Sequence, residues 1–340
     1  MEQKVIKISN YEDLVSMVED CNTKDKIQRI NYKYELTNNI DCENAVWRTP
    51  GTTFGDPTAF CGEFAGNGFT ISNLQITNES ASTLSDTNGI NVGFFGYTVD
   101  ADIHDVTFKN VNINITTDGY VRQELNGNNV NPVYAGIVVA RMECDQSNGG
   151  ETSLRNITVE DCNISVNAYK AYVGSVIGID HATIEKAKRE NLNVKNVTIF
   201  ARCLVNNTDR VVVGGIAGET QGGDAIVYNK CNINNLILRC WDGVDMASIP
   251  KNPTFMGAVV GRINNSASIT IKDCTIVDYA GLAVTQGQAG SYGYWGAATA
   301  YPIQSVLHIE NSTHSVTEGK ENIYYLQSGG GIVDSWIEQN

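Results

Sequence analysis

The segment Val213-Gly-Gly-Ile-Ala-Gly218 decides the fold, because related segments recur along the chain at a nearly constant spacing. Each copy is a short apolar run enclosed by small residues. Successive copies start 43, 38, 40 and 43 residues apart, and a fixed period of this length is the signature of a repeat protein. The other copies are Val92-Gly-Phe-Phe-Gly96, Ala135-Gly-Ile-Val-Val-Ala140, Val173-Gly-Ser-Val-Ile-Gly178 and Met256-Gly-Ala-Val-Val-Gly261.

A second repeated segment lies between the first ones and has apolar residues at its positions 1, 4 and 6. Apolar and polar residues alternate around it, which indicates a β-strand with one buried side. Helical periodicity is confined to residues 10–20 and 182–192. The copies are Ile71/Leu74/Ile76, Phe108/Val111/Ile113, Val159/Cys162/Ile164, Tyr228/Cys231/Ile233 and Ile271/Cys274/Ile276.

Two strand-rich segments in each repeat predict rungs of about 20 residues, with the glycine segment appearing once per two rungs. Strands of this kind, joined by Asn- and Gly-rich turns, predict an all-β fold that is a single right-handed parallel β-helix, or solenoid. A β-propeller, whose blades also span about 40 residues, is the alternative. It is less favoured because the copies lack a tryptophan-type blade signature and differ in loop length.

Three regions follow from the repeats. Residues 1–30 form an N-terminal cap with a short amphipathic helix, for which Asn10 is the expected N-cap. Residues 31–280 contain the β-helix repeats. Residues 281–340 are irregular and rich in Gly and aromatic residues, so we expect them to cap the other end or to bind a partner.

The cysteines are expected to be structural. In the alignment of the second segment, Cys162, Cys231 and Cys274 share the position of Leu74 and Val111, which predicts one column of small apolar side chains inside the coil. A metal or redox ladder is the functional alternative. The nine cysteines include no Cys-x-x-Cys pair, a pattern that favours reduced thiols over disulfides or a zinc site.

Residues 34–76 resemble the opening of β-helical proteins that carry the GLUG repeat. The resemblance rests on Tyr34-Glu-Leu-Thr-Asn-Asn-Ile-Asp41, then Trp47, then Phe60-Cys-Gly-Glu-Phe-Ala-Gly-Asn-Gly68. Ala65 and Asn39 stand where that family usually has Asp. The later glycine segments look like the repeat itself, over about residues 30–280. The resemblance implies a parallel β-helix of bacterial surface proteins, adhesins or phage-associated proteins, and it transfers no catalytic residue.

The composition limits the partners. A formal net charge of −14 argues against nucleic acid, whose phosphates need clustered Lys and Arg. No stretch approaches the ~20 apolar residues of a membrane span. The N-terminus has no apolar signal-peptide region, so we expect a virion component assembled in the cytosol first, and a surface or secreted protein second. Triplets such as those at Asn156 and Asn196 are expected at turns, not as glycan acceptors.

The residues just after each glycine segment are the candidates for chemistry. Glu143, Asp180, His181 and Glu219 are the weak catalytic candidates, since β-helical polysaccharide enzymes place carboxylates in a lateral groove and glycoside hydrolysis needs two carboxyl groups roughly 5–9.5 Å apart. A solvated turn after each strand is the favoured alternative. No metal or other cofactor is expected, although calcium is left open. Aligned on the second Gly, this stripe reads Tyr97, Arg141, Ile179, Glu219 and Arg262, of which Arg141 and Arg262 are candidate ligand-binding residues.

An aromatic cluster lies in the C-terminal region. Tyr292, Tyr294, Trp295 and Tyr301 fall within ten residues. Tyr and Trp stack on sugar rings or anchor protein interfaces, so they are candidate binding residues. Burial as a C-terminal plug is the equal alternative.

Three functions remain open. The first is a non-catalytic structural or binding protein, such as a phage tail or virion component or a surface adhesin, that recognises a glycan, a protein receptor or other virion proteins. The second is a polysaccharide hydrolase or lyase with a lateral carboxylate groove. The third is an acidic intracellular decoy that imitates DNA. Analogy with phage β-helices suggests a homotrimer.

Overall fold

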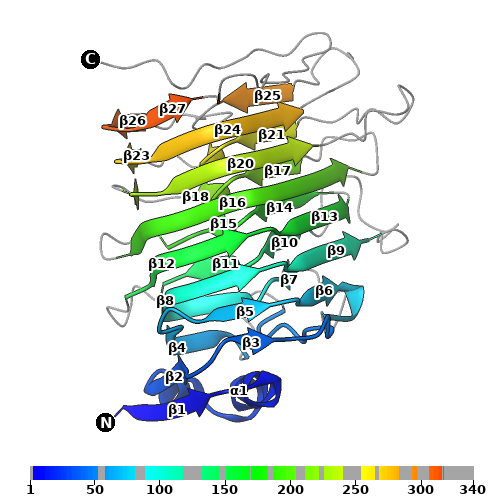
Figure 1. The fold of residues 1–340 in the computed structure, drawn as a ribbon, viewed down its shortest axis with the longest axis vertical. Coiled ribbons are helices and arrows are strands. Elements are labelled where there is room, and N and C mark those ends of the chain that lie inside the picture. The colour runs from blue at the N-terminus through cyan, green and yellow to red at the C-terminus, as the bar shows by residue number, and fades with distance from the viewer. Residues whose placement is uncertain are drawn as a thin grey trace.

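The chain is an elongated stack of parallel strands, with its two termini at opposite ends of the stack (Figure 1). Every strand pairing in both sheets is parallel over the described residues. The predicted parallel β-solenoid is therefore confirmed. The computed structural model describes residues 3–52, 58–80, 89–117, 132–144, 151–168, 170–182, 187–203, 211–221, 226–239, 254–264, 268–282, 293–296, 306–315 and 317.

Each coil of the solenoid takes about 40 residues. Val173 pairs with Val213, and Val213 pairs with Met256, so equivalent residues in adjacent coils are 40 and 43 residues apart. The prediction of rungs of about 20 residues is wrong. The two repeated segments are different sides of one coil, because a wide coil needs several strands before the chain returns to its starting side.

A helix covers the N-terminal end of the stack. Helix α1 begins at Tyr11, and Asn10 caps it by accepting a hydrogen bond from the amide of Asp13, as predicted. Its apolar side, including Leu14 and Met17, is buried against the first coil, which shields the open end of the core. The elements here are β1 (Lys4–Ile8), α1 (Tyr11–Thr23), α2 (Lys26–Arg29), β2 (Tyr32–Leu36) and β3 (Ile40–Asp41).

One side of the solenoid is a six-stranded sheet, and each of its strands is followed by a sharp corner into the larger sheet. The glycine segments form these corners, so they do not bracket a strand, as we had inferred, but join two. Its strands are β7 (Ile90–Val92), β10 (Val133–Gly136), β14 (Ala171–Gly174), β17 (Val211–Gly214), β21 (Thr254–Gly257) and β25 (Gly293–Gly296).

The glycines at these corners allow two backbones to touch. A Cβ atom on Gly178 would lie 2.7 Å from the amide nitrogen of Ala135, and one on Gly218 would lie 2.6 Å from that of Val173. A real Cβ cannot approach a backbone nitrogen this closely. The second glycine of each segment therefore lies against the first strand of the preceding coil, which explains its recurrence in the sequence.

The larger, 21-stranded sheet forms the rest of the wall. The helical periodicity at residues 182–192 does not give a helix, because strand β16 begins at Lys188 and is held by neighbouring strands on both edges. The remaining elements are β4 (Phe60–Ala65), β5 (Thr70–Ser72), β6 (Gln75–Thr77), η1 (Asn78–Ser80), β8 (Phe95–Lys109), β9 (Asn112–Thr116), β11 (Val139–Glu143), β12 (Ser153–Glu160), β13 (Asn163–Ala168), β15 (Ile177–Asp180), β16 (Lys188–Cys203), β18 (Ala217–Gln221), β19 (Ile226–Asn229), β20 (Asn232–Arg239), β22 (Val260–Asn264), β23 (Ser268–Lys272), β24 (Thr275–Leu282), β26 (Val306–Glu310) and β27 (Thr313–Ser315).

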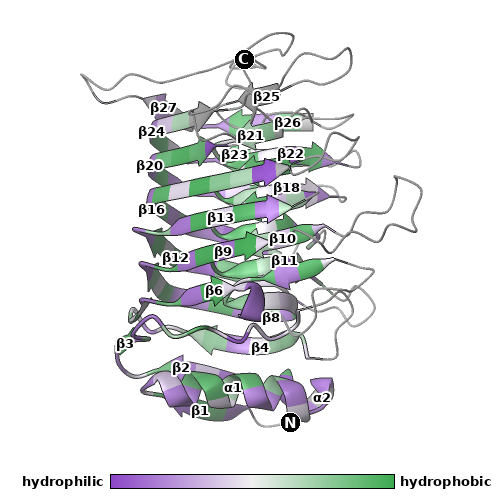
Figure 2. Ribbon diagram, turned by 90° about the vertical axis from the view of Figure 1, so that its right-hand side faces the viewer, coloured by the Kyte–Doolittle hydropathy of each residue, from purple (hydrophilic) through white to green (hydrophobic). Residues whose placement is uncertain are grey.

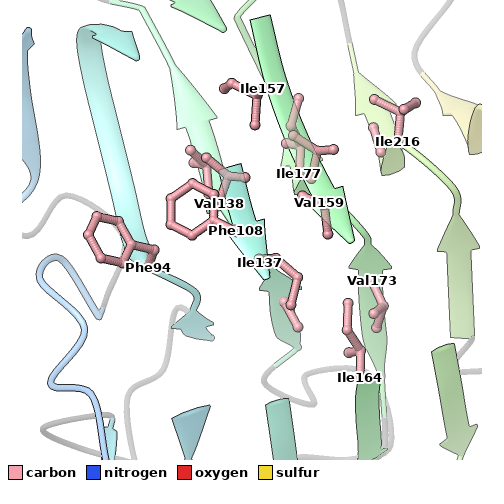
Figure 3. Close-up of a cluster of buried hydrophobic side chains, with 14 of the residues drawn as sticks. Phe94, Phe108, Ile137, Val138, Ile157, Val159, Ile164, Val173, Ile177 and Ile216 are labelled. Carbon is pink, nitrogen blue, oxygen red and sulfur yellow. The ribbon is translucent and has the colours of Figure 1, made fainter. Parts of the chain in front are cut away.

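The core is a continuous column of apolar side chains inside the coils. Residues from different sides of one coil meet there, such as Phe94 at a glycine corner and Phe108 on β8, whose ring centroids are 5.0 Å apart (Figure 3). Along the strands, hydrophobic and hydrophilic residues alternate (Figure 2), as expected when every second side chain points inward. Burial of this apolar area is the main stabilising force.

Two columns of residues with positive φ run along the larger sheet, five residues apart, and we call them the first and second αL columns. Asn and Asp adopt this conformation at lower cost than other non-Gly residues, which explains why Asn156 and Asn196 occur at these turns. The first αL column contains Asp105, Asn156, Asn191, Lys230, Asp273 and Asn311, and the second contains Asn73, Asn110, Asp161, Asn196, Asn235 and Asp278.

Side-chain hydrogen bonds connect these columns from coil to coil. In the second αL column, Asn235 donates to Asn196 and Asn196 donates to Asp161, each through its amide nitrogen at 2.9 Å. In the first, Asn191 donates to Asn156 at 2.9 Å. Stacked amides thus satisfy one another at positions where the strand bends.

The cysteines are buried, but they do not form the single column that we predicted. Cys231 lies opposite Leu192 and Cys274, whereas Cys162 lies opposite Val111 and Val197. The alignment failed because the apolar pattern repeats on both sides of the second αL column, and a shift of five residues preserves it. The described cysteines are free thiols, and all except Cys144 are buried.

The parallel pairing extends past the expected region boundaries. Strand β1 already pairs with β2, before residue 31. Strands β26 and β27, after residue 280, continue the pairing of β23 and β24. Described strands therefore occur in all three predicted regions.

Candidate functional site

The polar stripe predicted after the glycine segments exists as a column in register, and we call it the corner stripe. Tyr97 lies opposite Arg141, Arg141 opposite Ile179, Ile179 opposite Glu219, and Glu219 opposite Arg262. All five residues are buried, and Glu219 is 0% exposed. The sequence alternative of solvated turns therefore does not describe this column.

Aromatic side chains of the six-stranded sheet cover the corner stripe. Tyr134 and Tyr172 stack with ring centroids 5.3 Å apart. The Arg141 guanidinium lies 5.4 Å from the ring centroid of Tyr134, and that of Arg262 lies 5.9 Å from Tyr172 and 5.7 Å from Phe255. Arginine over an aromatic face is attractive and keeps its polar edge free for a carboxylate.

Both arginines of the corner stripe are paired with carboxylates. Arg262 forms a buried ion pair with Glu219, which also accepts a hydrogen bond from Gln221. Arg141 Nη2 lies 2.6 Å from Glu143 Oε1. His181 Nδ1 lies 3.2 Å from the same carboxylate oxygen and 3.1 Å from Arg141 Nη2.

The charge state of Glu143 bears on the enzymatic alternative. Burial raises its pKa, but the hydrogen bond to His181 and the charge and hydrogen bond of Arg141 outweigh this effect, so the pKa is lowered. A glycosidase general acid needs the opposite shift, because it must be protonated near neutral pH. Glu143 is therefore suited to holding charged partners in place rather than to donating a proton.

Asp180 belongs to a different environment, inside the coil. It is 0% exposed and forms an ion pair with Arg189. Tyr228 donates a hydrogen bond to Asp180 at 2.8 Å, and Thr220 lies 2.7 Å from the Tyr228 hydroxyl. The backbone carbonyl of Ala182 also accepts from Arg189. Sequence adjacency to His181 therefore gives no catalytic pair, since the two side chains point to opposite sides of the wall.

A second candidate surface, which the sequence reasoning missed, lies on the outward side of the larger sheet beside the second αL column. We call it the outer face and define it by four columns of side chains in register. They are the threonine column (Thr70, Thr107, Thr158, Asn193, Asn232, Thr275, Thr313), the mixed column (Ser72, Lys109, Glu160, Lys195, Asn234, Val277, Ser315), the amide column (Gln75, Asn112, Asn163, Thr198, Ile237, Ala280) and the edge column (Thr77, Asn114, Ser165, Phe200, Arg239).

The outer face is flat, regular and largely uncharged. Its residues alternate with core residues along every strand, as the burial pattern of β12 and β20 shows. Its strands stack one above another (Figure 1), so hydroxyl and amide groups repeat about every 4.8 Å. In the mixed column, Glu160 pairs with Lys109 and with Lys195. The sequence signal was present as the triad Thr-x-Glu-Asp-x-Asn and its relatives, but a shifted alignment obscured it.

A depression opens at the N-terminal end of the outer face. It has a volume of about 370 Å³ and is lined by side chains of the edge column, Thr77 and Asn114, together with Val46, Asn78 and Thr116. Val46 is 41% exposed. An apolar floor surrounded by amides and hydroxyls can take one sugar-sized group.

The predicted C-terminal aromatic cluster is only partly described. Tyr292 and Tyr301 lie outside the described residues. Tyr294 and Trp295 belong to β25, where Tyr294 pairs with Phe255 and Trp295 pairs with Met256. Their positions thus continue an outward and an inward column, respectively. Whether they bind a ligand stays a prediction.

Comparison with known proteins gives no assignment. No family model, no curated protein and no solved structure matches the chain. Membership in the GLUG-repeat group therefore stays a prediction, whereas the parallel β-solenoid is observed. Among the described residues, no group of three or more His, Cys, Asp or Glu could hold a metal ion, and no helix is long and apolar enough to cross a membrane.

Proposed function

We propose that this protein is a non-catalytic binding protein whose outer face binds an extended glycan. The supporting observation is the threonine column, in which seven hydroxyl or amide side chains follow one another in register from Thr70 to Thr313. A linear polysaccharide is the ligand that repeats hydrogen-bonding groups over such a length. Hydroxyl and amide groups both donate and accept, as sugar hydroxyls do.

The ion pairs of the corner stripe support the absence of catalysis in this proposal. Its carboxylates, Glu143 and Glu219, are held by Arg141 and Arg262, and they are not poised as an acid and a base. Charge on the outer face is confined to a few paired side chains, so it does not repeat along one face like the phosphates of DNA. This arrangement favours glycan binding over the decoy alternative.

Binding of bacterial polysaccharides to the full chain by isothermal titration calorimetry tests the proposal. The double variant Asn163→Ala/Ser165→Ala removes two polar groups of the outer face and should weaken binding at least several-fold. Thr270→Ala, on β23 outside the outer face, is the matched control and should bind as the wild type does. If no polysaccharide binds the wild type, or if both variants bind equally, the proposal is wrong.

The biological setting is the second part of the proposal. The resemblance to GLUG-repeat proteins favours a virion receptor-binding component or a surface adhesin, either of which must hold a cell-surface glycan. Mass spectrometry of purified virions and of the cell-surface fraction distinguishes the two. Release of reducing sugar ends by the purified protein would replace the binding function with a glycan-degrading one.

A further inference from the structure

The outer face contains a strip without acidic residues. Strands β6, β9, β13 and β20, together with residues 197–203 of β16, contain no Asp or Glu, although the chain has 38 of them. The strip is occupied by Asn, Gln, Ser and Thr, and it carries two arginines, Arg202 and Arg239. In a protein of net charge −14, this is a local reversal of sign, and it favours a neutral or anionic ligand.

An aromatic residue lies at the centre of this strip. Phe200 follows Ser165 in the edge column and lies opposite Arg239 of the next coil. It is half-buried and alternates with the core residues Ile199 and Ala201, so its ring faces outward. Phe200 is the one aromatic residue in the four columns of the outer face. A ring in this position is a platform on which the apolar face of a pyranose can stack.

The two arginines flank that platform and are not neutralised. Arg239 is exposed and lies beside Phe200 on the adjacent strand, and Arg202 lies two residues further along the same side of β16, opposite Asn167. Neither has an ion-pair partner among the described residues. By contrast, Lys109 and Lys195 on the same face are both paired with Glu160.

We propose that Phe200, Arg202 and Arg239 form a subsite for a sugar that carries a carboxylate, a hexuronic acid type of residue within the bound glycan. The ring stacks on Phe200, and the arginine forks bind the carboxylate in the planar, two-oxygen geometry that guanidinium groups favour. Amides of Asn163 and Asn167, on the neighbouring strand β13, reach the hydroxyls of the adjoining sugars. This subsite rests on the proposed glycan-binding function of the outer face.

Binding of polygalacturonate, alginate and hyaluronan to the full chain tests the subsite. Each polymer is compared with the same polymer after its carboxyl groups have been reduced to alcohols. We expect the wild type to bind at least one acidic form about tenfold more tightly than its reduced form, a preference of about 1.4 kcal/mol. Arg202→Gln/Arg239→Gln should abolish this preference and keep the affinity for the reduced form. Phe200→Ala should weaken binding of both forms.

The matched control is Lys109→Gln/Lys195→Gln, which removes the same amount of charge from the same face away from Phe200. It should keep the preference for the acidic form. Circular dichroism and melting curves establish that all variants are folded. If the lysine control loses the preference as fully as the arginine variant does, or if dextran sulfate and single-stranded DNA bind equally well, the attraction is a general one for polyanions and the subsite is refuted.

The two proposals fail in different ways. If the wild type binds the reduced, neutral polymers as tightly as the acidic ones, the carboxylate subsite is wrong and the glycan-binding outer face stands. If it binds neither form nor any other polysaccharide, both proposals are wrong. Loss of binding in Asn163→Ala/Ser165→Ala, with the acidic preference unchanged in the arginine variant, would contradict the subsite alone.

Discussion

The thiol of Cys274 accepts a hydrogen bond from the backbone amide of Cys231, with the nitrogen and sulfur 3.3 Å apart. Each of these cysteines follows a residue of the first αL column, where the bend turns one amide away from the usual ladder partner. The same contact recurs between the Val111 amide and Cys162 at 3.4 Å, after the second αL column. In the last described coil, the Ser312 hydroxyl takes this role for the amide of Cys274 at 2.9 Å.

The first prediction follows from that contact. Cys274→Ser should keep most of the free energy of unfolding, because a hydroxyl already serves at Ser312. Cys274→Ala should lose about 1–3 kcal/mol, since it leaves the buried Cys231 amide without a partner. Urea unfolding followed by circular dichroism measures both. Equal losses for the two variants would mean that cysteine acts there only as an apolar filler.

The second prediction concerns the buried ion pair of Asp180 and Arg189. One coil earlier, the same positions are occupied by Met142 and Leu154. Arg189→Leu alone should cost about 3–5 kcal/mol, because Asp180 would remain buried without its partner. The double variant Asp180→Met/Arg189→Leu should recover most of the loss. Urea unfolding of the single and double variants completes the cycle, and a double variant no more stable than the single one contradicts this reading.

Lys230 supports a stabilising substitution. It adopts φ of 53° in the first αL column, where Asn is less strained, and its ion pair with Glu190 is long and exposed, at 3.6 Å. Lys230→Asn should raise the free energy of unfolding by about 0.5–1 kcal/mol, because Asn tolerates this conformation and can hydrogen-bond locally. Lys230→Ala is the control, and it should not be stabilising. A gain with Ala equal to that with Asn would show that the αL preference is irrelevant.

Acid sensitivity is expected at the corner stripe. The folded-state pKa of Glu143 is lowered by His181 and Arg141 against the effect of burial. A lowered pKa stabilises the fold above the unfolded-state value, roughly 4.3, and this contribution is lost as the pH falls through the folded-state pKa. The stability difference between wild type and Glu143→Gln should therefore shrink below about pH 4.3. A difference that stays constant down to the acid transition would argue against ionisation of Glu143 as its source.

The sequence was sufficient to predict the parallel solenoid and its helical cap. The glycine segments recur because two backbones touch at Gly178 and Gly218, and Asn10 caps α1 because its side chain can accept from Asp13. Both are local requirements for a particular residue type, and a single sequence displays them. The corner stripe was predicted for the same reason, since Arg141 and Arg262 stand at a fixed distance after a glycine segment.

Only the tertiary structure decided the register between coils and the two sides of the wall. Apolar alternation survives a shift of five residues, so the sequence placed Cys162 in one column with Cys231 and Cys274, and it read one coil as two. The direction of each side chain follows from that register, which is why Asp180 is inside the core while His181 lies outside. The outer face, with Phe200 beside Arg239, likewise exists only because strands 39 residues apart pair in register.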